Sequence, residues 1–281
     1  MTPGEVGEHP APETESDVVP TGAARALHNL LDAPGSPPAG GDPLPPLWHW
    51  LAFLPRVPQK DLGPDGHPQL GSSTRLQAFP RRMFAGARLW FPGTARVDRQ
   101  LVRQSDVVST TEKSGRSGPL LFVTIEHRIA NDEAAVVREE QDIVYRPSQQ
   151  QGAARAEDPV PPMNDWTWAL DLHPSETMLF RFSALTYNAH RIHYDRPYAR
   201  EVEGYPGLVV HGPLHAIALA EVCRRYCPDR RMTSFEFRAL RPAFEGETLK
   251  FRGRPNGSSV ELVAFDSSGR RTMEATATLE R

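Results

Sequence analysis

Residues 180–227 read FRFSALTYNAHRIHYDRPYAREVEGYPGLVVHGPLHAIALAEVCRRYC, and this stretch decides how the rest of the chain is interpreted. Apolar and hydroxyl residues alternate at its start, which predicts a strand over 178–186. Polar side chains follow directly after that strand. They are Asn188, His190, His193, Asp195, His211 and His215. The chain therefore concentrates its candidate chemistry at the end of one predicted strand.

A second pattern begins after His211 and Gly212, where apolar residues recur at three- and four-residue spacing. This spacing predicts a buried helix that ends before Pro228, and Pro213 is tolerated in its first turn because an N–H there would have no partner. The free backbone N–H groups at the start of a helix favour negative charge. We expect them to stabilise a charge that develops on a carbonyl oxygen, with His193 placed to move a proton.

Length, charge and cysteine content restrict the class of protein. The chain has 281 residues, enough for two domains, and its formal net charge of −3 gives no electrostatic reason to bind nucleic acid or an anionic membrane. It has no run of eighteen apolar residues and only two cysteines, Cys223 and Cys227, too few for a disulfide framework or a structural zinc site. We therefore expect a soluble, cytoplasmic protein with neither a nucleic-acid nor a membrane partner.

Two similar halves follow one another along the chain. After a Pro- and Glu-rich tail over 1–22, which we expect to be disordered, an apolar segment at 47–54 predicts a helix. A polar linker at 146–165 separates the halves, so we expect domains over 23–150 and 151–281. The predicted strands cover 83–91, 101–113, 120–131, 134–145, 166–172, 178–186, 232–240, 248–255, 259–266 and 272–280. A helix followed by antiparallel strands, present twice, predicts a two-repeat α+β architecture.

Four segments resemble a known family. The segments are SALTYNAHRIHYDRPYA at 183–199, GLVVHGPL at 207–214, LPPLWHWLAFLP at 44–55 and residues 160–182, which lead into the first of these. All four are similar to the MaoC-type (R)-specific enoyl-thioester hydratases and dehydratases. The likeness is strongest to the branch of mesaconyl-C4-CoA hydratase, itaconyl-CoA hydratase and type 2 3-hydroxyacyl-thioester dehydratase. The resemblance implies an α+β double hot dog fold, with two antiparallel sheets each wrapped around a central helix. It also implies that only the C-terminal hot dog domain carries the hydratase motif.

The resemblance also suggests which residues act. The family motif has an aspartate, an asparagine two residues later and a histidine three residues after that; this chain has Asn188, His190 and His193 at those places. An asparagine amide can hold a water molecule but cannot take its proton, so His193 is the candidate general acid/base. The family further suggests that the backbone N–H of Gly212, next to His211, binds the thioester oxygen.

The implied reaction is hydration of a 2-enoyl-CoA thioester to a 3-hydroxyacyl-CoA, or the reverse dehydration. Coenzyme A enters as part of the substrate, so we expect no separate cofactor, and we expect a homodimer. A short, dicarboxylic acyl group such as mesaconyl or itaconyl would need an arginine partner. The candidate substrate-binding residues are His190, Arg191, Tyr194, Asp195, His211 and Arg82.

Three alternatives remain open from the residues. A hot dog thioesterase would use a carboxylate, for which Glu203 or Glu221 could serve. A metal enzyme would use the histidines, but two histidines three residues apart are a weak ligand signal, and we predict no metal site. A non-catalytic acyl-thioester binding protein would explain the loss of the motif aspartate at Asn188.

Overall fold

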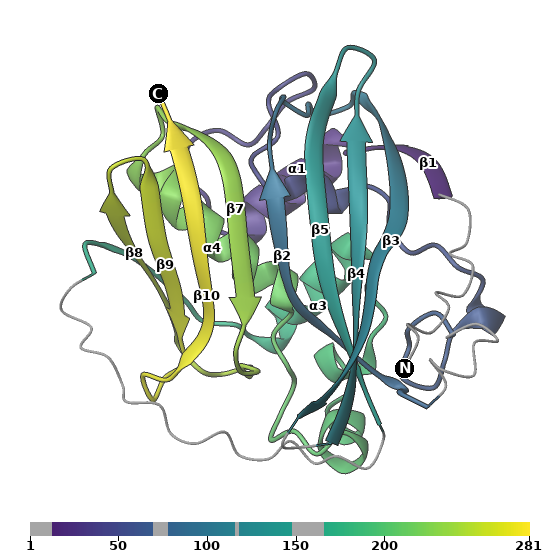
Figure 1. Cartoon of the computed structure of the whole chain (residues 1–281). Helices are drawn as coiled ribbons and strands as arrows, with labels where there is room; N and C mark the ends of the chain where they lie inside the picture. Colours follow the sequence, from purple (N-terminus) through teal and green to yellow (C-terminus); the bar gives the residue numbers. More distant parts are fainter. Residues whose placement is uncertain (1–12, 70–77, 116–117, 148–165) are drawn as a thin grey trace, which may run out of the picture.

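The computed structural model describes residues 13–69, 78–115, 118–147 and 166–281, and its strands form one antiparallel ten-stranded sheet (Figure 1). The strand order is β1-β3-β4-β5-β2-β7-β10-β9-β8-β6. The strands are β1 (Glu13–Val18), β2 (Arg81–Trp90), β3 (Gln100–Gly115), β4 (Gly118–Ala130), β5 (Ala135–Arg146), β6 (Trp168–Leu172), β7 (Arg231–Ala239), β8 (Leu249–Asn256), β9 (Ser259–Phe265) and β10 (Arg271–Glu280). The helices are α1 (Thr21–Leu30), α3 (Glu176–Thr186) and α4 (Gly212–Tyr226), with short helices η1 (Trp48–Leu51), η2 (Gln59–Asp61), η4 (Arg191–His193) and η5 (Tyr198–Val202).

The two predicted sheets are joined edge to edge through β2 and β7. These two strands occupy corresponding places in the two halves and pair antiparallel, from Gly86 opposite Arg238 to Trp90 opposite Ser234. A Cβ atom on Gly86 would lie 2.4 Å from the carbonyl oxygen of Phe237, so glycine permits the close approach at this seam. The double hot dog prediction is confirmed, with the two sheets continuous rather than separate.

The strand predicted over 178–186 is wrong, because these residues belong to helix α3. Ser175 begins the helix, and its hydroxyl oxygen accepts a hydrogen bond from the backbone N–H of Met178 at 3.2 Å. Phe180 is 65% exposed, which shows that the alternation of aromatic residues does not mark one buried face. The residues that α3 buries, at three- and four-residue spacing, are Leu179, Phe182 and Ser183. The period is therefore helical.

The helix predicted at 47–54 is also wrong, since only a short 3₁₀ helix, η1, forms there. Leu47 and Phe53 adopt left-handed backbone conformations, with φ of 72° and 56°, and so interrupt any longer helix at both ends. The segment is nevertheless buried, and Glu139 on β5 holds it in place. The Glu139 carboxylate accepts hydrogen bonds from His49 Nε2 at 3.1 Å, Trp50 Nε1 at 3.0 Å and Gln141 Nε2 at 2.9 Å. Burial alone would raise the pKa of Glu139, but the hydrogen bond and charge of His49 lower it overall.

The disordered tail predicted over 1–22 is wrong for residues 13–22, which contain β1 and the start of α1. The acidic residues of β1 find specific partners: the Asp17 carboxylate accepts the N–H of Phe53 at 2.8 Å and lies 2.9 Å from Arg56. Polar composition alone suggested disorder because these partners are distant in the sequence. The first twelve residues and most of the predicted linker at 146–165 lie outside the described residues.

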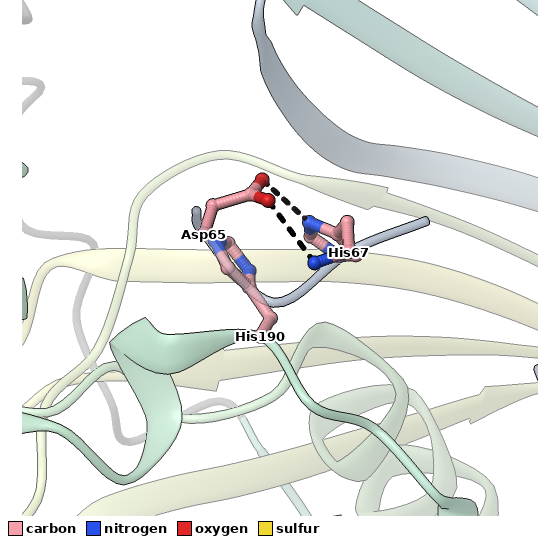
Figure 2. A group of neighbouring side chains, drawn as sticks. All are labelled: Asp65, His67 and His190. Atoms are coloured by element: carbon pink, nitrogen blue, oxygen red, sulfur yellow. Dashed lines mark hydrogen bonds and ion pairs between the residues drawn. The ribbon is translucent and has the colours of Figure 1, made fainter. Parts of the chain in front are cut away.

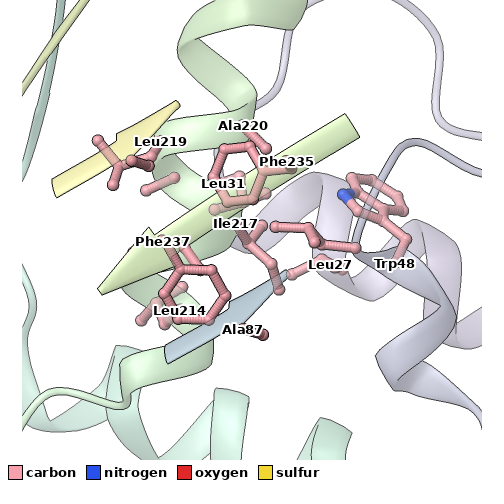
Figure 3. Packing of buried hydrophobic residues seen from close by; sticks show 14 of the residues in the cluster. Leu27, Leu31, Trp48, Ala87, Leu214, Ile217, Leu219, Ala220, Phe235 and Phe237 are labelled. Carbon is pink, nitrogen blue, oxygen red and sulfur yellow. The ribbon is translucent and has the colours of Figure 1, made fainter. Parts of the chain in front are cut away.

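One apolar core connects both halves and fixes the position of α4. Figure 3 shows side chains of α4, such as Leu214 and Ile217, packed with Leu27 of the first half and Phe235 of the second. Ten of the fifteen residues of α4 are buried, and each large apolar side chain buried in this way contributes about 1.5–3 kcal/mol. The start of α4 is therefore held rigidly. Among the described residues, no helix has both the length and the apolar character to cross a membrane.

Candidate active site

The start of α4 is the electrostatic centre of the site. His211 caps the helix, and its carbonyl oxygen accepts the N–H of His215 at 3.1 Å. Gly212 and Pro213 form the first turn, where backbone N–H groups have no acceptor within the helix. Among the described residues, a Cβ atom on Gly212 would meet only Phe84 Cδ1, at an ordinary contact distance of 3.7 Å. Packing therefore does not require a glycine here.

His193 is oriented as a neutral base. Its Nδ1 lies 2.7 Å from the carbonyl oxygen of Val209, which can only accept, so Nδ1 carries the proton and Nε2 has a free lone pair. The backbone completes the clamp, since the N–H of Val209 donates to the carbonyl oxygen of Ile192 at 2.9 Å. Burial lowers the pKa of His193 to about 4, which keeps the ring unprotonated at neutral pH.

His193 lies directly over the cap of α4. Its ring stacks on the ring of His211, with the centroids 3.7 Å apart and the planes inclined by 18°. The His211 Nε2 atom lies 2.8 Å from the hydroxyl oxygen of Ser183 on α3, and this hydrogen bond fixes the orientation of the His211 ring. Two buried ring nitrogens, Nδ1 of His211 and Nε2 of His215, have no hydrogen-bond partner among the described residues. The expected approach of His193 to the start of the helix is thus present in the structure.

Asn188 closes the turn that follows α3. Tyr187 ends the helix in a left-handed conformation, and the Asn188 N–H donates to the carbonyl oxygen of Ser183 at 2.9 Å. The Asn188 Oδ1 atom accepts the N–H of His190 at 3.0 Å. The side-chain oxygen is therefore engaged within the turn, while the NH₂ group is a donor that could hold a water molecule.

His190 connects His193 to a segment of the first half. Its ring centroid lies 5.4 Å from that of His193, nearly perpendicular, and 4.0 Å from that of His67. Burial and the charges of His67 and His193 lower the pKa of His190 to about 2, and Arg82 on β2 also contributes. His190 is therefore neutral.

The sequence analysis missed Asp65 and His67, which reach the site from a turn. Both carboxylate oxygens of Asp65 accept hydrogen bonds from His67, one from its N–H and one from Nδ1, each at 3.0 Å; Figure 2 shows these bonds beside the ring of His190. Burial alone would raise the pKa of Asp65, but the hydrogen bond and charge of His67 lower it to about 2. The one signal in the sequence was an acidic residue and a histidine on either side of Gly66.

These residues also form a group that could hold a metal ion. One ligand atom from each of Asp65, His67 and His190 lies within 4.8 Å of the others, and carboxylate and imidazole are common zinc ligands. Of the four histidines considered for a metal from the sequence, His190, His193, His211 and His215, only His190 belongs to this group. In the structure Asp65 and His67 already satisfy each other through hydrogen bonds, so the arrangement does not depend on an ion.

Three predicted substrate-binding residues instead brace the loop after His190. Arg191 forms a salt bridge with Asp195 at 2.7 Å, and its guanidinium lies 4.1 Å from the ring centroid of Tyr198. The hydroxyl of Tyr194 donates to the carbonyl oxygen of Ala189 at 3.1 Å. The charges of Arg191 and Asp195 therefore neutralise each other within the loop. Contact of Arg191, Tyr194 or Asp195 with substrate stays a prediction.

The carboxylates considered for a thioesterase are bound elsewhere. Glu221 pairs with Arg224 at 2.6 Å and Arg225 at 2.8 Å towards the other end of α4. Glu203 lies 3.3 Å from Arg81 and accepts a hydrogen bond from the Tyr198 hydroxyl at 3.2 Å. Neither arrangement offers a carboxylate free to activate a water molecule.

The architecture is the hot dog fold that MaoC-like dehydratases also have. A MaoC-like dehydratase from Phytophthora capsici has the same fold, with a TM-score of 0.71 over 96% of each chain at 13% sequence identity. The chain itself belongs to the hydroxyacyl-thioester dehydratase type 2 family, whose model matches residues 47–245. The named relatives are hydro-lyases.

Two relatives show the extent of the similarity. Mesaconyl-C(4)-CoA hydratase of Chloroflexus aurantiacus is 45% identical over 267 residues, covering 95% of both chains. The mitochondrial hydroxyacyl-thioester dehydratase type 2 of Schizosaccharomyces pombe is 28% identical over 237 residues, covering 74% of this chain and 76% of the relative. The similarity therefore includes the described active-site loop and both halves of the fold.

Proposed function

We propose that the protein hydrates a 2-enoyl-CoA thioester to a 3-hydroxyacyl-CoA and catalyses the reverse dehydration. The observation that carries this proposal is the neutral imidazole of His193, fixed by the Val209 carbonyl and stacked on the cap of α4. A free Nε2 lone pair beside a helix start provides a base and a site for negative charge in one place.

The chemistry follows from this geometry. His193 Nε2 takes a proton from a water molecule, whose oxygen then bonds to the β carbon of the enoyl group. Negative charge moves to the thioester oxygen, where the Gly212 N–H and the α4 dipole stabilise it. The NH₂ group of Asn188 can donate a hydrogen bond to the attacking water but cannot take its proton.

The proposed substrate is a short dicarboxylic enoyl-CoA such as mesaconyl-C4-CoA. The name of the 45% identical relative supports this choice. We assign the second carboxylate to Arg82 on β2, whose positive charge acts on His190. We expect Arg82→Gln to raise KM for mesaconyl-C4-CoA by about tenfold or more, the loss of a charge-assisted hydrogen bond, while KM for crotonyl-CoA changes little. An equal effect on both substrates would remove Arg82 from the carboxylate site.

The test of the function is a direct assay. The purified protein is mixed with mesaconyl-C4-CoA or crotonyl-CoA, and enoyl absorbance and free thiol are followed together. Hydration removes the enoyl absorbance without releasing thiol, whereas a thioesterase releases thiol. A non-catalytic binding protein would change neither signal, and that result would refute the proposal.

We also propose that the enzyme acts in the cytoplasm as a homodimer without a resident cofactor. An apolar groove of about 340 Å³ between α1 and α3 supports dimerisation, because Phe180 on its rim is 65% exposed. The groove lining is Ala26, Leu30, Phe180, Arg181, Ala184 and Leu185. Light scattering should give the mass of a dimer for the wild type and of a monomer for Phe180→Glu; a monomeric wild type would contradict the proposal.

A further inference from the structure

The turn at 63–67 is fastened to the loop that carries His190 and His193. The carbonyl oxygen of Asp65 accepts the N–H of Arg191 at 2.8 Å, and Arg191 Nη1 donates to the carbonyl oxygen of Pro64 at 2.9 Å. Gly66 has a φ of +88°, and a Cβ atom there would lie 1.8 Å from the carbonyl oxygen of Ala189. The two backbones thus meet more closely than any side chain would allow. A segment of the first half is built into the site of the second.

The first consequence is that this chain, which has Asn188 in place of the motif aspartate, has an oriented imidazole, that of His67, beside His190 of the same motif. Hydration moves two protons: one leaves the water, and one reaches the α carbon. His193 can handle the first, but Asn188 cannot handle the second. His67 has a carboxylate oxygen on Nδ1 at 3.0 Å, which leaves its Nε2 as the nitrogen available for proton transfer.

We propose that His67, oriented by Asp65, is the second proton-transfer residue of the hydration reaction. This proposal rests on the proposed function and adds a residue to it. Asp65 is a positioning residue, since it acts through His67. His67 therefore supplies the proton to the α carbon while His193 takes one from the water.

The charges in the cluster support this division of roles. Three imidazoles lie in a row, with ring centroids 4.0 Å apart between His67 and His190 and 5.4 Å between His190 and His193. Like charges at such distances repel, so the row favours a single proton. The Asp65 carboxylate stands at the His67 end, while burial holds the pKa of His190 at about 2 and that of His193 at about 4. Because the Asp65 carboxylate faces His67 and the Val209 carbonyl faces His193, we assign His67 as the acid and His193 as the base.

The proposed step balances. The oxygen of water bonds to the β carbon as its proton passes to His193 Nε2, and the electron pair of the carbon–carbon double bond moves towards the thioester. The α carbon then takes the proton from Nε2 of protonated His67. The proton on His67 Nδ1 stays on that nitrogen, hydrogen-bonded to the Asp65 carboxylate. His193 returns its proton to His67 through solvent, and both rings recover their initial states.

The experiment compares three variants of the full-length protein with mesaconyl-C4-CoA as substrate. His67→Ala should lower kcat by about 100- to 10,000-fold with little change in KM or thermal midpoint, and added imidazole should restore part of the rate. Asp65→Asn should lower kcat by about tenfold or more, since it keeps an acceptor for the His67 N–H but not for Nδ1. His173→Ala is the matched control, an exposed histidine bonded to Thr248, and should leave the rate unchanged.

The outcomes separate this proposal from the proposed function. A wild type that hydrates no enoyl-CoA refutes the function. A wild type that hydrates normally, with His67→Ala equally active, refutes only the role of His67. A slow His67→Ala enzyme that imidazole does not rescue, with a lowered thermal midpoint, would make His67 a structural residue. If chelation abolished wild-type activity and zinc restored it, Asp65, His67 and His190 would be metal ligands, and the proposal would be overturned.

Discussion

Replacing Gly66 by alanine tests whether the turn at 63–67 must touch the loop that carries His190 and His193, called here the hydratase loop. The new Cβ atom would lie 1.8 Å from the Ala189 carbonyl oxygen, whereas real Cβ contacts essentially never fall below 3.0 Å. The turn must therefore retreat by at least 3.0 − 1.8 = 1.2 Å from the backbone beside His190. Asp65 and His67 would move with it.

Two effects of different size follow from this substitution. A misplacement of about 1 Å near the reacting groups can cost about 100-fold in rate. The left-handed backbone of Gly66, with a φ of +88°, adds a strain of about 1–2 kcal/mol for alanine, whatever surrounds it. Gly41→Ala separates the two effects, because Gly41 has a φ of +85° and, in the described part of the chain, no heavy atom lies within 4 Å of the position of a Cβ atom there.

The assay measures enoyl-CoA hydration and the thermal midpoint for both variants. Both should lose similar stability through backbone strain, a few degrees in the midpoint for a chain of this size. Gly66→Ala alone should also lose about 100-fold in turnover. If Gly66→Ala turns over as fast as Gly41→Ala, the contact between the turn and the hydratase loop has no part in catalysis.

Three further predictions concern the helix start, the buried carboxylate and acid stability. Gly212→Ala should fold normally, because the nearest described atom to the added methyl is at an ordinary contact distance of 3.7 Å. Turnover should fall at least about tenfold, because the thioester must approach this backbone closely. Unchanged kinetics would show that Gly212 does not bind the thioester oxygen. Glu139→Ala should lower the free energy of unfolding in urea by about 3–5 kcal/mol, since the buried His49 and the partly buried Trp50 and Gln141 lose their acceptor. The exposed Glu261→Ala should cost less than about 1 kcal/mol. Burial lowers the pKa of His193 and His215 from 6.5 to about 4, so the unfolded chain binds protons first as the pH falls. Stability should be complete above pH 6.5 and decrease towards pH 4, by roughly 3 kcal/mol for each ring; a urea midpoint that does not change between pH 7.5 and 4.5 would contradict the buried, neutral state.

The sequence predicted the strands and α4 well because their patterns are local. Alternation over long strands and the three- and four-residue spacing after Gly212 needed no knowledge of distant partners. The strand predicted at 178–186 failed because alternating aromatic residues fit two periods, and only the exposure of Phe180 and the cap at Ser175 distinguish them. In β1, polar residues looked disordered although their partners lie in β3 and near η1.

The candidate site likewise contains residues that a local pattern predicts and residues that it does not. His193, Gly212 and Asn188 were found from one contiguous stretch whose spacing resembles a family motif. The stacking of His193 on His211, and the bond from Ser183, required only that the loop return to the start of α4. Asp65 and His67 could not be predicted, because their approach to His190 depends on how the first half folds against the second. No local pattern carries that information.

The most direct test of the central claim is the turnover of His193→Gln with mesaconyl-C4-CoA. Glutamine can still donate to the Val209 carbonyl, so the loop should keep its position while the basic Nε2 lone pair is lost. We expect kcat to fall by about 100- to 10,000-fold with KM and thermal midpoint nearly unchanged. A His193→Gln enzyme with the wild-type kcat would show that this imidazole is not the base.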